Sequence, residues 1–270
     1  MQSQFSFKKS ISIFLAAVFF TLMAFPSTSG IGQTAVLRPP LQFGNDYLIE
    51  NEIRQHVKLH KLPELSQSVM ASKFVRQGSQ DKKRISITFD DGPYLMTEKY
   101  IKVLQEYDIQ ATFFLIGVQI EKYPDEAKKI VEGGYEIGVH SYAHRNLSAM
   151  NLSSIEADFE KSLAAVKKIT DSNIRFFRPP FGAFNDSVIG VAKKHNLATI
   201  LWCVDPRDWQ ENNPDLVAQH VLDHAVNGAI ILLHEGREST VNALPKIIEG
   251  LWAQGYEIVP LSELLSEEIS

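Results

Sequence analysis

From residue 84 onward, short apolar runs alternate with stretches of helical periodicity, and this alternation leaves few folds open to the chain. The expected strands are Ile85–Phe89, Ala111–Gly117, Glu136–His140, Arg175–Arg178, Ala198–Val204, Ala229–His234 and Tyr256–Pro260. Strands that are each followed by a helix predict a parallel sheet covered by helices. Seven such units in so short a stretch are compact for a barrel. We therefore expect an α/β fold, an incomplete or distorted (β/α)7 barrel with parallel strands.

The stretches between these runs carry signals for helix ends. The expected helices are Thr97–Tyr107, Ile120–Glu132, Ser153–Thr170, Asp186–His195, Pro214–Val226 and Val241–Gln254. Ser153 and Glu156 have the spacing of a capping box, which predicts a helix start at Ser153. Gly133 and Gly134 suit a helix end, and Pro214 suits a first helical turn. The helical half of the alternation therefore has support of its own.

The N-terminus has the layout of a targeting segment. Lys8 and Lys9 precede an apolar run over residues 11–24, and small residues follow Pro26. The run is shorter than the ~20 residues that span a bilayer, which favours a secretory signal. We expect residues 1–30 to be a signal peptide or an N-terminal anchor that holds the protein at the membrane. The expected location is outside the cytoplasm: extracellular, associated with the cell wall, or anchored and facing outward.

A polar stretch, Gln77–Asp81, divides the rest of the chain. We expect residues 31–80 to be a linker or a small N-terminal segment, with a helix near Tyr47–Leu59. Residues 81–268 are expected to form the main domain, as a monomer. The only cysteine, Cys203, excludes an internal disulfide, and we expect it to be a buried apolar side chain.

The charge balance argues against one class of partner. The chain has 27 basic and 32 acidic residues, a formal net charge of −5. Nucleic acid requires a basic face, so we expect no nucleic-acid partner. A neutral polymer remains compatible with this composition.

Two adjacent acids, Asp90 and Asp91, follow the first expected strand. Neighbouring side chains of a strand point to opposite faces, so both acids can serve one site only where the backbone turns. Gly92 and Pro93 mark such a turn. Loops at the carboxyl ends of parallel strands carry the chemistry of α/β folds. One acid could bind a metal while its neighbour handles a proton.

Two histidines, His140 and His144, stand at the end of the third expected strand. A pair this close is often only a surface feature. Two neutral imidazoles and one carboxylate would, however, form a three-ligand site with an open position, as catalytic zinc prefers.

The fourth expected strand ends in Arg178, followed by Pro179-Pro180 and Phe181. The prolines lack N–H groups, so Phe181 is the first residue that can offer one, for example to a developing oxyanion. Arg178 could hold a carboxylate in a bidentate clamp. A rigid turn without further function is the alternative.

Asp208 and Trp209 follow the fifth expected strand, and His234 closes the sixth. Trp209 could stack on sugar faces, or it could be ordinary packing. Asp208 could be a helix cap. His234 is more often structural at such a place, but at this rim of the barrel it could be a general acid.

The chain resembles the polysaccharide deacetylase family, also known as NodB-homology domains or carbohydrate esterase family 4, which includes bacterial peptidoglycan N-acetylglucosamine deacetylases. The resemblance covers roughly residues 82–265 and rests on motifs in the family's order: TFDDGP, HSxxH, RPPFG, DPRDW and LLH. It implies an incomplete (β/α) barrel of about seven units, in agreement with the alternation.

The resemblance also implies roles for single residues. Asp91, His140 and His144 would bind the metal, zinc or another divalent transition metal. Asp90 would be the general base for the attacking water, and Arg178 would tether Asp90.

Other implied roles concern the substrate. The Phe181 N–H would stabilise the oxyanion, and the Phe181 and Leu232 side chains would line the acetyl pocket beside a wall at Trp209. His234 would protonate the departing amine, with Asp208 tuning its pKa. Glu235 stands where the family commonly has aspartate, and Phe181 where it has tyrosine; neither departure touches an implied catalytic atom.

The implied function is that of a zinc-dependent polysaccharide N-deacetylase, a hydrolase of non-peptide C–N bonds in linear amides. Its partner would be an N-acetylated glycan polymer, and we expect N-acetylglucosamine units of a cell-wall polysaccharide, peptidoglycan first. The alternatives are a deacetylase of chitooligosaccharide, exopolysaccharide or acetylxylan, and a wall-binding relative without catalysis.

Overall fold

The computed structural model describes residues 63–267 and 269. The expected signal peptide or anchor at residues 1–30, and the helix expected near Tyr47–Leu59, lie outside the described residues. Within the described part, no helix combines the length and the apolar character that crossing a membrane requires.

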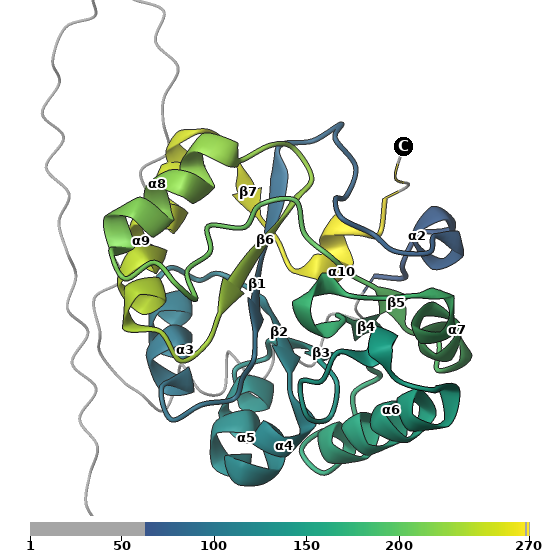
Figure 1. Ribbon diagram of the computed structural model, residues 1–270. Coiled ribbons are helices and arrows are strands. Elements are labelled where there is room, and N and C mark those ends of the chain that lie inside the picture. Colours follow the sequence, from purple (N-terminus) through teal and green to yellow (C-terminus); the bar gives the residue numbers. More distant parts are fainter. Residues whose placement is uncertain (1–62, 268, 270) are drawn as a thin grey trace, which may run out of the picture. The chain divides into compact units, whose positions relative to one another are not determined.

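Seven strands form one sheet at the centre of the domain (Figure 1). They are β1 (Arg84–Asp90), β2 (Thr112–Leu115), β3 (Glu136–Val139), β4 (Phe176–Phe177), β5 (Ala198–Thr199), β6 (Ala229–His234) and β7 (Glu257–Ile258). Their order is β5-β4-β3-β2-β1-β6, and β7 pairs with the start of β1. Every pairing between these strands is parallel, which confirms the predicted incomplete barrel with parallel strands.

Helices surround this sheet (Figure 1). They are α2 (Gln67–Ala71), α3 (Thr97–Glu106), α4 (Gly117–Lys122), α5 (Pro124–Glu132), α6 (Leu152–Lys167), α7 (Asp186–Lys194), α8 (Pro214–His224), α9 (Glu238–Ala253) and α10 (Leu261–Leu264), with short 3-10 turns at Leu147–Ala149 and Pro180–Gly182. The helix expected over Ile120–Glu132 is divided into α4 and α5, because Tyr123 precedes Pro124 and a residue before proline avoids the helical region. The predicted capping box is also wrong, since α6 begins earlier and the Asn151 side chain accepts the Ser154 N–H.

Alternation along the strands separates two apolar cores. Ile85, Ile87 and Phe89 of β1 lie in the larger core, which also contains side chains of the surrounding helices. Phe114 of β2 and Ile230 of β6 belong to a smaller core that also holds residues of α10. The sheet is therefore buried on both faces, as strands in parallel sheets usually are.

The segment before β1 packs into the gap between β5 and β6. The Val75 N–H donates to the Thr199 carbonyl at 2.9 Å, and the Leu201 N–H donates to the Val75 carbonyl at 2.7 Å. Further along, the Gly78 N–H donates to the Gly228 carbonyl at 2.8 Å. The Val75 side chain is buried in the smaller core. This segment, residues 75–78, thus runs along the open side of the barrel, and we refer to it as the seam.

The fifth strand is shorter than expected, and this corrects the prediction for Cys203. Beyond Thr199 the chain makes only isolated bridges, Ile200 with Val75 and Val204 with Ile231. Cys203 lies between these bridges and is exposed, so the prediction of a buried apolar side chain was wrong.

We predict that Val75→Ala lowers the free energy of unfolding by about 2 kcal/mol, because it removes two buried methyl groups from the seam. Urea unfolding would measure the effect, with Lys73→Ala as control, since the Lys73 pair with Asp186 is exposed. Equal stability of the two variants would mean that the seam contributes nothing to the fold.

Candidate active site

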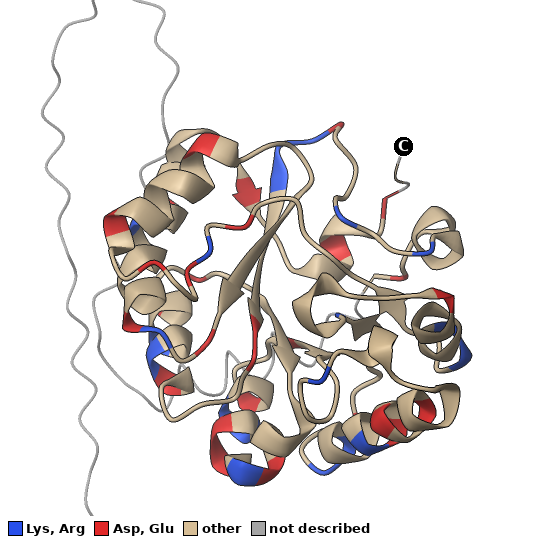
Figure 2. Cartoon of the chain, viewed as in Figure 1, with Lys and Arg blue, Asp and Glu red and all other residues tan. Residues whose placement is uncertain are grey.

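The site begins where two central strands end side by side. Asp90 ends β1 and His234 ends β6, and the register of the two strands pairs these residues directly. Asp90 lies on the same face of β1 as Thr88, opposite the larger core. Figure 2 shows many charged residues on outer helices such as α5 and α6, where water solvates them. The carboxyl group of Asp90 is in a very different setting, because only 2% of the surface of this residue is exposed.

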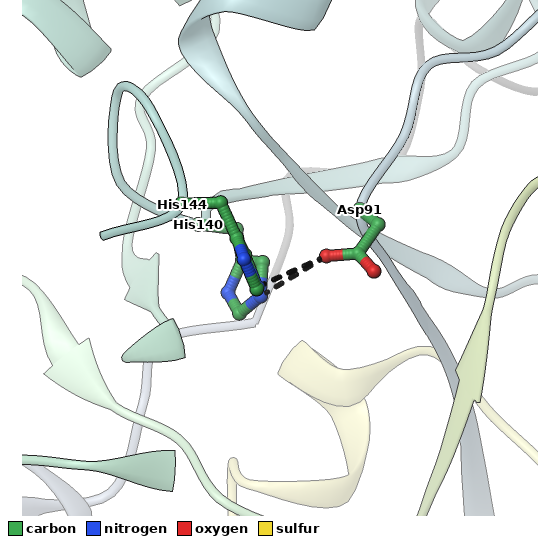
Figure 3. A group of neighbouring side chains, drawn as sticks. All are labelled: Asp91, His140 and His144. Atoms are coloured by element: carbon green, nitrogen blue, oxygen red, sulfur yellow. Dashed lines mark ion pairs between the residues drawn. The ribbon is translucent and has the colours of Figure 1, made fainter. Parts of the chain in front are cut away.

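Asp91, His140 and His144 point their donor atoms toward one another (Figure 3). Asp91 Oδ1 lies 3.2 Å from His144 Nε2 and 3.6 Å from His140 Nε2. The ligand atoms of all three side chains lie within 4.8 Å of one another. The turn after β1 supplies the carboxylate, and the loop after β3 supplies both imidazoles.

The protonation of this group suits a metal ion. His140 Nδ1 lies 2.8 Å from the Arg178 carbonyl oxygen, which only accepts, so Nδ1 carries the proton and Nε2 keeps its lone pair. Burial lowers the pKa of His140 to about 3, so the ring is neutral. Asp91 Oδ1 is buried without a hydrogen-bond donor. A carboxylate oxygen in that state, facing two imidazoles, fits a divalent transition metal such as zinc.

The loops that carry these ligands have unusual backbone angles. Asp91, Ser141, His144 and Phe181 have φ values of 74°, 64°, 51° and 60°, in the left-handed region that side chains other than glycine rarely adopt. Each such residue costs about 1 kcal/mol or more unless its surroundings enforce it. Ser141 Oγ enforces one of them by accepting the His144 N–H at 2.9 Å. The histidine loop is therefore shaped before any ligand arrives.

Arg178 holds Asp90 from inside the barrel. Arg178 is fully buried, and its Nη1 donates to Asp90 Oδ1 at 2.7 Å and to Thr88 Oγ1 at 2.8 Å. Its Nε and Nη2 donate to the carbonyls of Ile200 and Leu201. The predicted bidentate clamp is thus wrong, because the remaining donors are used by backbone oxygens. Burial raises the pKa of Asp90, and the Arg178 charge opposes that rise.

A second carboxylate orients His234. His234 Nδ1 lies 2.7 Å from Asp208 Oδ1, and Asp208 Oδ2 accepts the His234 N–H at 2.8 Å and the Thr240 hydroxyl at 2.7 Å. Burial alone would lower the pKa of His234, but the bond to Asp208 and the negative charges nearby raise it to about 9. The imidazole is therefore protonated at neutral pH, and Nε2 is the nitrogen left for a substrate.

The residues expected to contact substrate occupy different depths. Phe181 is 68% exposed, and its ring meets the His144 ring edge-on at 4.7 Å. Leu232 is buried on β6, next to Thr88 of β1. Trp209 is half exposed beside Asp208.

Two hollows lie beside these groups. The first has a volume of about 290 Å³ and is lined by Asp91, Tyr94, Ile116, Val118, Gln119, Ala143 and His144. The second, of about 120 Å³, is lined by Arg76, Phe181, Gly182, Leu201 and Trp202. His144 lines the first hollow and contacts Phe181, which lines the second, so both hollows adjoin the group formed by Asp91, His140 and His144.

Glu235 supports the site and was not predicted to do so. Its N–H donates to the Asp90 carbonyl at 2.9 Å, and its carboxyl group accepts the Thr97 hydroxyl. Burial raises the pKa of Glu235 to about 8. A Cβ at Gly92 would lie only 1.7 Å from Glu235 Oε1, so the two residues fit only while position 92 has no side chain. In the sequence, Gly92 next to the paired acids was the sign of a close contact. The residue that makes this contact, Glu235, is far away in the chain.

Comparisons with known proteins agree with one another. A sequence model described as Polysaccharide deacetylase matches residues 77–200. A peptidoglycan-N-acetylglucosamine deacetylase of Bacillus cereus is 39% identical over 194 residues, which cover 68% of this chain and 89% of that protein. The peptidoglycan-N-acetylglucosamine deacetylase PgdA of Listeria monocytogenes is 34% identical over 192 residues, 71% of this chain but only 41% of that protein.

A solved structure is also similar. BA3943 of Bacillus anthracis, described as a CE4 family pseudoenzyme, superposes with a TM-score of 0.67 at 32% identity, and the match covers 72% of this chain and 69% of that chain. Fold similarity therefore extends to a protein described as a pseudoenzyme, so the site residues must decide the question of activity.

We predict that Gly92→Ala weakens zinc binding by at least about tenfold, the range seen when supports of metal ligands are removed. The added methyl group would push the Asp91 turn away from Glu235. Competition with a chromophoric chelator would measure the affinity. Gly190→Ala on α7 is the control, because a Cβ there meets nothing within 4 Å.

The double variant Gly92→Ala/Glu235→Ala should recover part of the lost affinity, because the truncated side chain makes room. If Gly92→Ala bound zinc as tightly as Gly190→Ala, the contact with Glu235 would have no part in placing Asp91.

Proposed function

Because this chain belongs to the polysaccharide deacetylase family, we propose that it is a metal-dependent hydrolase that removes N-acetyl groups from N-acetylglucosamine units of peptidoglycan. One observation carries the proposal: a buried carboxylate held by Arg178, an Asp-His-His group and an Asp-paired histidine lie at the carboxyl ends of neighbouring strands. Amide hydrolysis requires a base, an electrophile and an acid in that kind of proximity.

Asp91, His140 and His144 would hold the metal, and zinc suits this donor set best. A bound divalent ion supplies Lewis-acid activation of the acetyl carbonyl and of the attacking water. The chain's part is to keep both imidazoles neutral and the carboxylate turned toward them. Another divalent transition metal would be compatible with the same ligands.

Asp90 is assigned the role of general base. Arg178 binds Oδ1, while Oδ2 lies 3.6 Å from His140 Nε2, on the side of the metal-ligand group. An attacking water there is within reach of a carboxylate oxygen whose orientation is fixed. The raised pKa of Asp90 makes it a better proton acceptor than an ordinary aspartate, provided the pH keeps it ionised.

His234 is assigned the role of general acid. Its pKa of about 9 keeps a proton available at neutral pH, and the bond from Nδ1 to Asp208 leaves Nε2 to donate. Because His234 pairs with Asp90 across β1 and β6, the acid and the base lie side by side and can act on one reacting group. The Phe181 N–H would receive the oxyanion, and Leu232 would contact the acetyl methyl group.

Peptidoglycan is favoured as substrate by the names of the relatives in Bacillus cereus and Listeria monocytogenes. The apolar N-terminal run, with its preceding lysines, favours export to where that polymer is found. A cleaved signal would release the protein outside the cell, whereas an uncleaved one would anchor it facing the wall. Chitooligosaccharide, exopolysaccharide and acetylxylan are alternative substrates.

The similarity to a pseudoenzyme raises a second candidate, a wall-binding protein without turnover. This chain retains an aspartate at position 90 and its partner Arg178, together with the paired His234 and Asp208. A complete set of ionisable groups in hydrogen-bonded geometry favours the enzyme.

We predict that Asp90→Asn lowers the rate of acetate release from N-acetylglucosamine oligomers by at least about 100-fold, since a general base contributes 10²–10⁴-fold. Zinc binding should persist because the three ligands are unchanged. Asp125→Asn on α5, an exposed acid, is the matched control. Near-normal turnover by Asp90→Asn would contradict the assignment of the base.

A second prediction concerns pH. The general acid must be protonated, so wild-type kcat/KM should fall as the pH rises through about 9, the pKa of His234. Asp208→Asn removes the charge that raises this pKa, while burial continues to lower it, so the alkaline limb should move to lower pH. A profile of kcat/KM from about pH 6 to 10 would show the movement, and an unchanged alkaline limb would exclude His234 as the acid.

A further inference from the structure

We propose that Arg76 forms a carboxylate-binding subsite beside the reacting centre and selects glycans that carry an acidic neighbour unit. The subsite is the smaller hollow, lined by Arg76, Phe181, Gly182, Leu201 and Trp202. The inference rests on the proposed function, because it concerns which part of the same polymer lies next to the acetyl group that is removed.

The seam fixes the position of Arg76. Val75 exchanges backbone hydrogen bonds with Thr199 and Leu201, and the Gln77 side chain donates to the Asn227 carbonyl at 2.7 Å. The residue between these two anchors, Arg76, therefore has a fixed backbone although its side chain is exposed. A guanidinium on a fixed backbone loses less freedom on binding a ligand than one on a free loop.

An aromatic shelf supports the guanidinium. Arg76 Cζ lies 5.5 Å from the centre of the Phe74 ring, within the range of a cation–π contact, and the Phe74 ring lies 5.0 Å from the Phe184 ring. Among the described ion pairs, none involves Arg76, so no carboxylate of that part of the chain competes for it.

The hollow and the metal-ligand group share a wall. Phe181 contacts His144 and also lines the hollow with Arg76. Gly182, at φ 64°, keeps the floor open, because a Cβ there would lie 3.0 Å from the Trp202 ring. A polymer whose acetyl group lies at the metal ligands can therefore reach Arg76 with an adjoining unit, because Phe181 borders both places.

The two hollows differ in charge. The larger one, which His144 lines, has no Lys or Arg in its lining, whereas the smaller one contains Arg76. This difference between the hollows suits a glycan polymer in which uncharged and acidic units alternate. In peptidoglycan, the muramic unit provides the acid, either on its lactyl ether or, where that is amidated, on the attached peptide. A guanidinium binds such a carboxylate through two parallel N–H donors.

The test compares kcat/KM for acetate release from matched substrates. One is glycan freed of peptide, with lactyl carboxylates, and its partner is the same glycan with those carboxylates reduced to alcohols. Glycan that retains its peptides is a third arm and separates peptide acids from the lactyl acid. Neutral N-acetylglucosamine oligomers are the reference.

The proteins are wild type, Arg76→Gln, Arg76→Lys and Lys167→Gln. Lys167 is an exposed cation on α6, so its variant matches the charge change away from the hollow. Wild type should have a higher kcat/KM for at least one of the two acidic glycans than for the uncharged substrates. Arg76→Gln should reduce that preference about three- to tenfold, the range for a partly exposed charged hydrogen bond. Arg76→Lys should retain part of it, and added salt should weaken it in every protein that keeps a cation at position 76, but not in Arg76→Gln.

Two results would overturn the inference: no preference for either acidic glycan in wild type, or a preference that Arg76→Gln leaves unchanged. An equal loss on acidic and neutral substrates would also contradict it, because that indicates general damage. Failure of the proposed function is a separate result, namely no acetate from any substrate with metal bound, whereas activity without selectivity would contradict Arg76 alone.

Discussion

The fold and the site both depend on the burial of one guanidinium, that of Arg178. Removing such a charge from water costs several kcal/mol, and only well-placed hydrogen bonds and an opposite charge recover that cost. Its partners come from three separate parts of the barrel: Thr88 and Asp90 of β1, Phe114 of β2, and the carbonyls of Ile200 and Leu201 after β5. The Arg178 carbonyl also sets the tautomer of His140. One buried cation thus links the barrel strands, Asp90 and His140.

Outside that centre, the site is arranged by backbone strain. Asp91, His144 and Phe181 all lie in the left-handed region, on turns that follow the buried strands. The strained turns hold the groups that must face an ion or a substrate, whereas the regular strands β1 and β6 hold Asp90 and His234. The regular strands therefore carry the proposed proton-transfer groups, and the loops carry the proposed binding groups. The Glu235 carboxyl group under the Asp91 turn connects the two.

Much of this was predictable because strand periodicity and the position of a residue at a strand end are local properties. The parallel barrel followed from the alternation of apolar runs, and the nearness of Asp91, His140 and His144 followed from parallel strands ending at one rim. Long-range geometry was not predictable. The single-nitrogen contact of Arg178, the seam at Val75 and the place of Glu235 all depend on partners distant in sequence. Cys203 was misjudged because its strand ends early.

We propose that Asp90, His234 and the group of Asp91, His140 and His144 form one metal-dependent catalytic centre. Its most direct test is acetate release from N-acetylglucosamine oligomers and from purified peptidoglycan by the protein as prepared, after chelation, and after zinc is added back. Acetate release should disappear with the chelator and return with zinc. Release that is insensitive to the chelator, or no release from either substrate while zinc is bound at Asp91, His140 and His144, would contradict it.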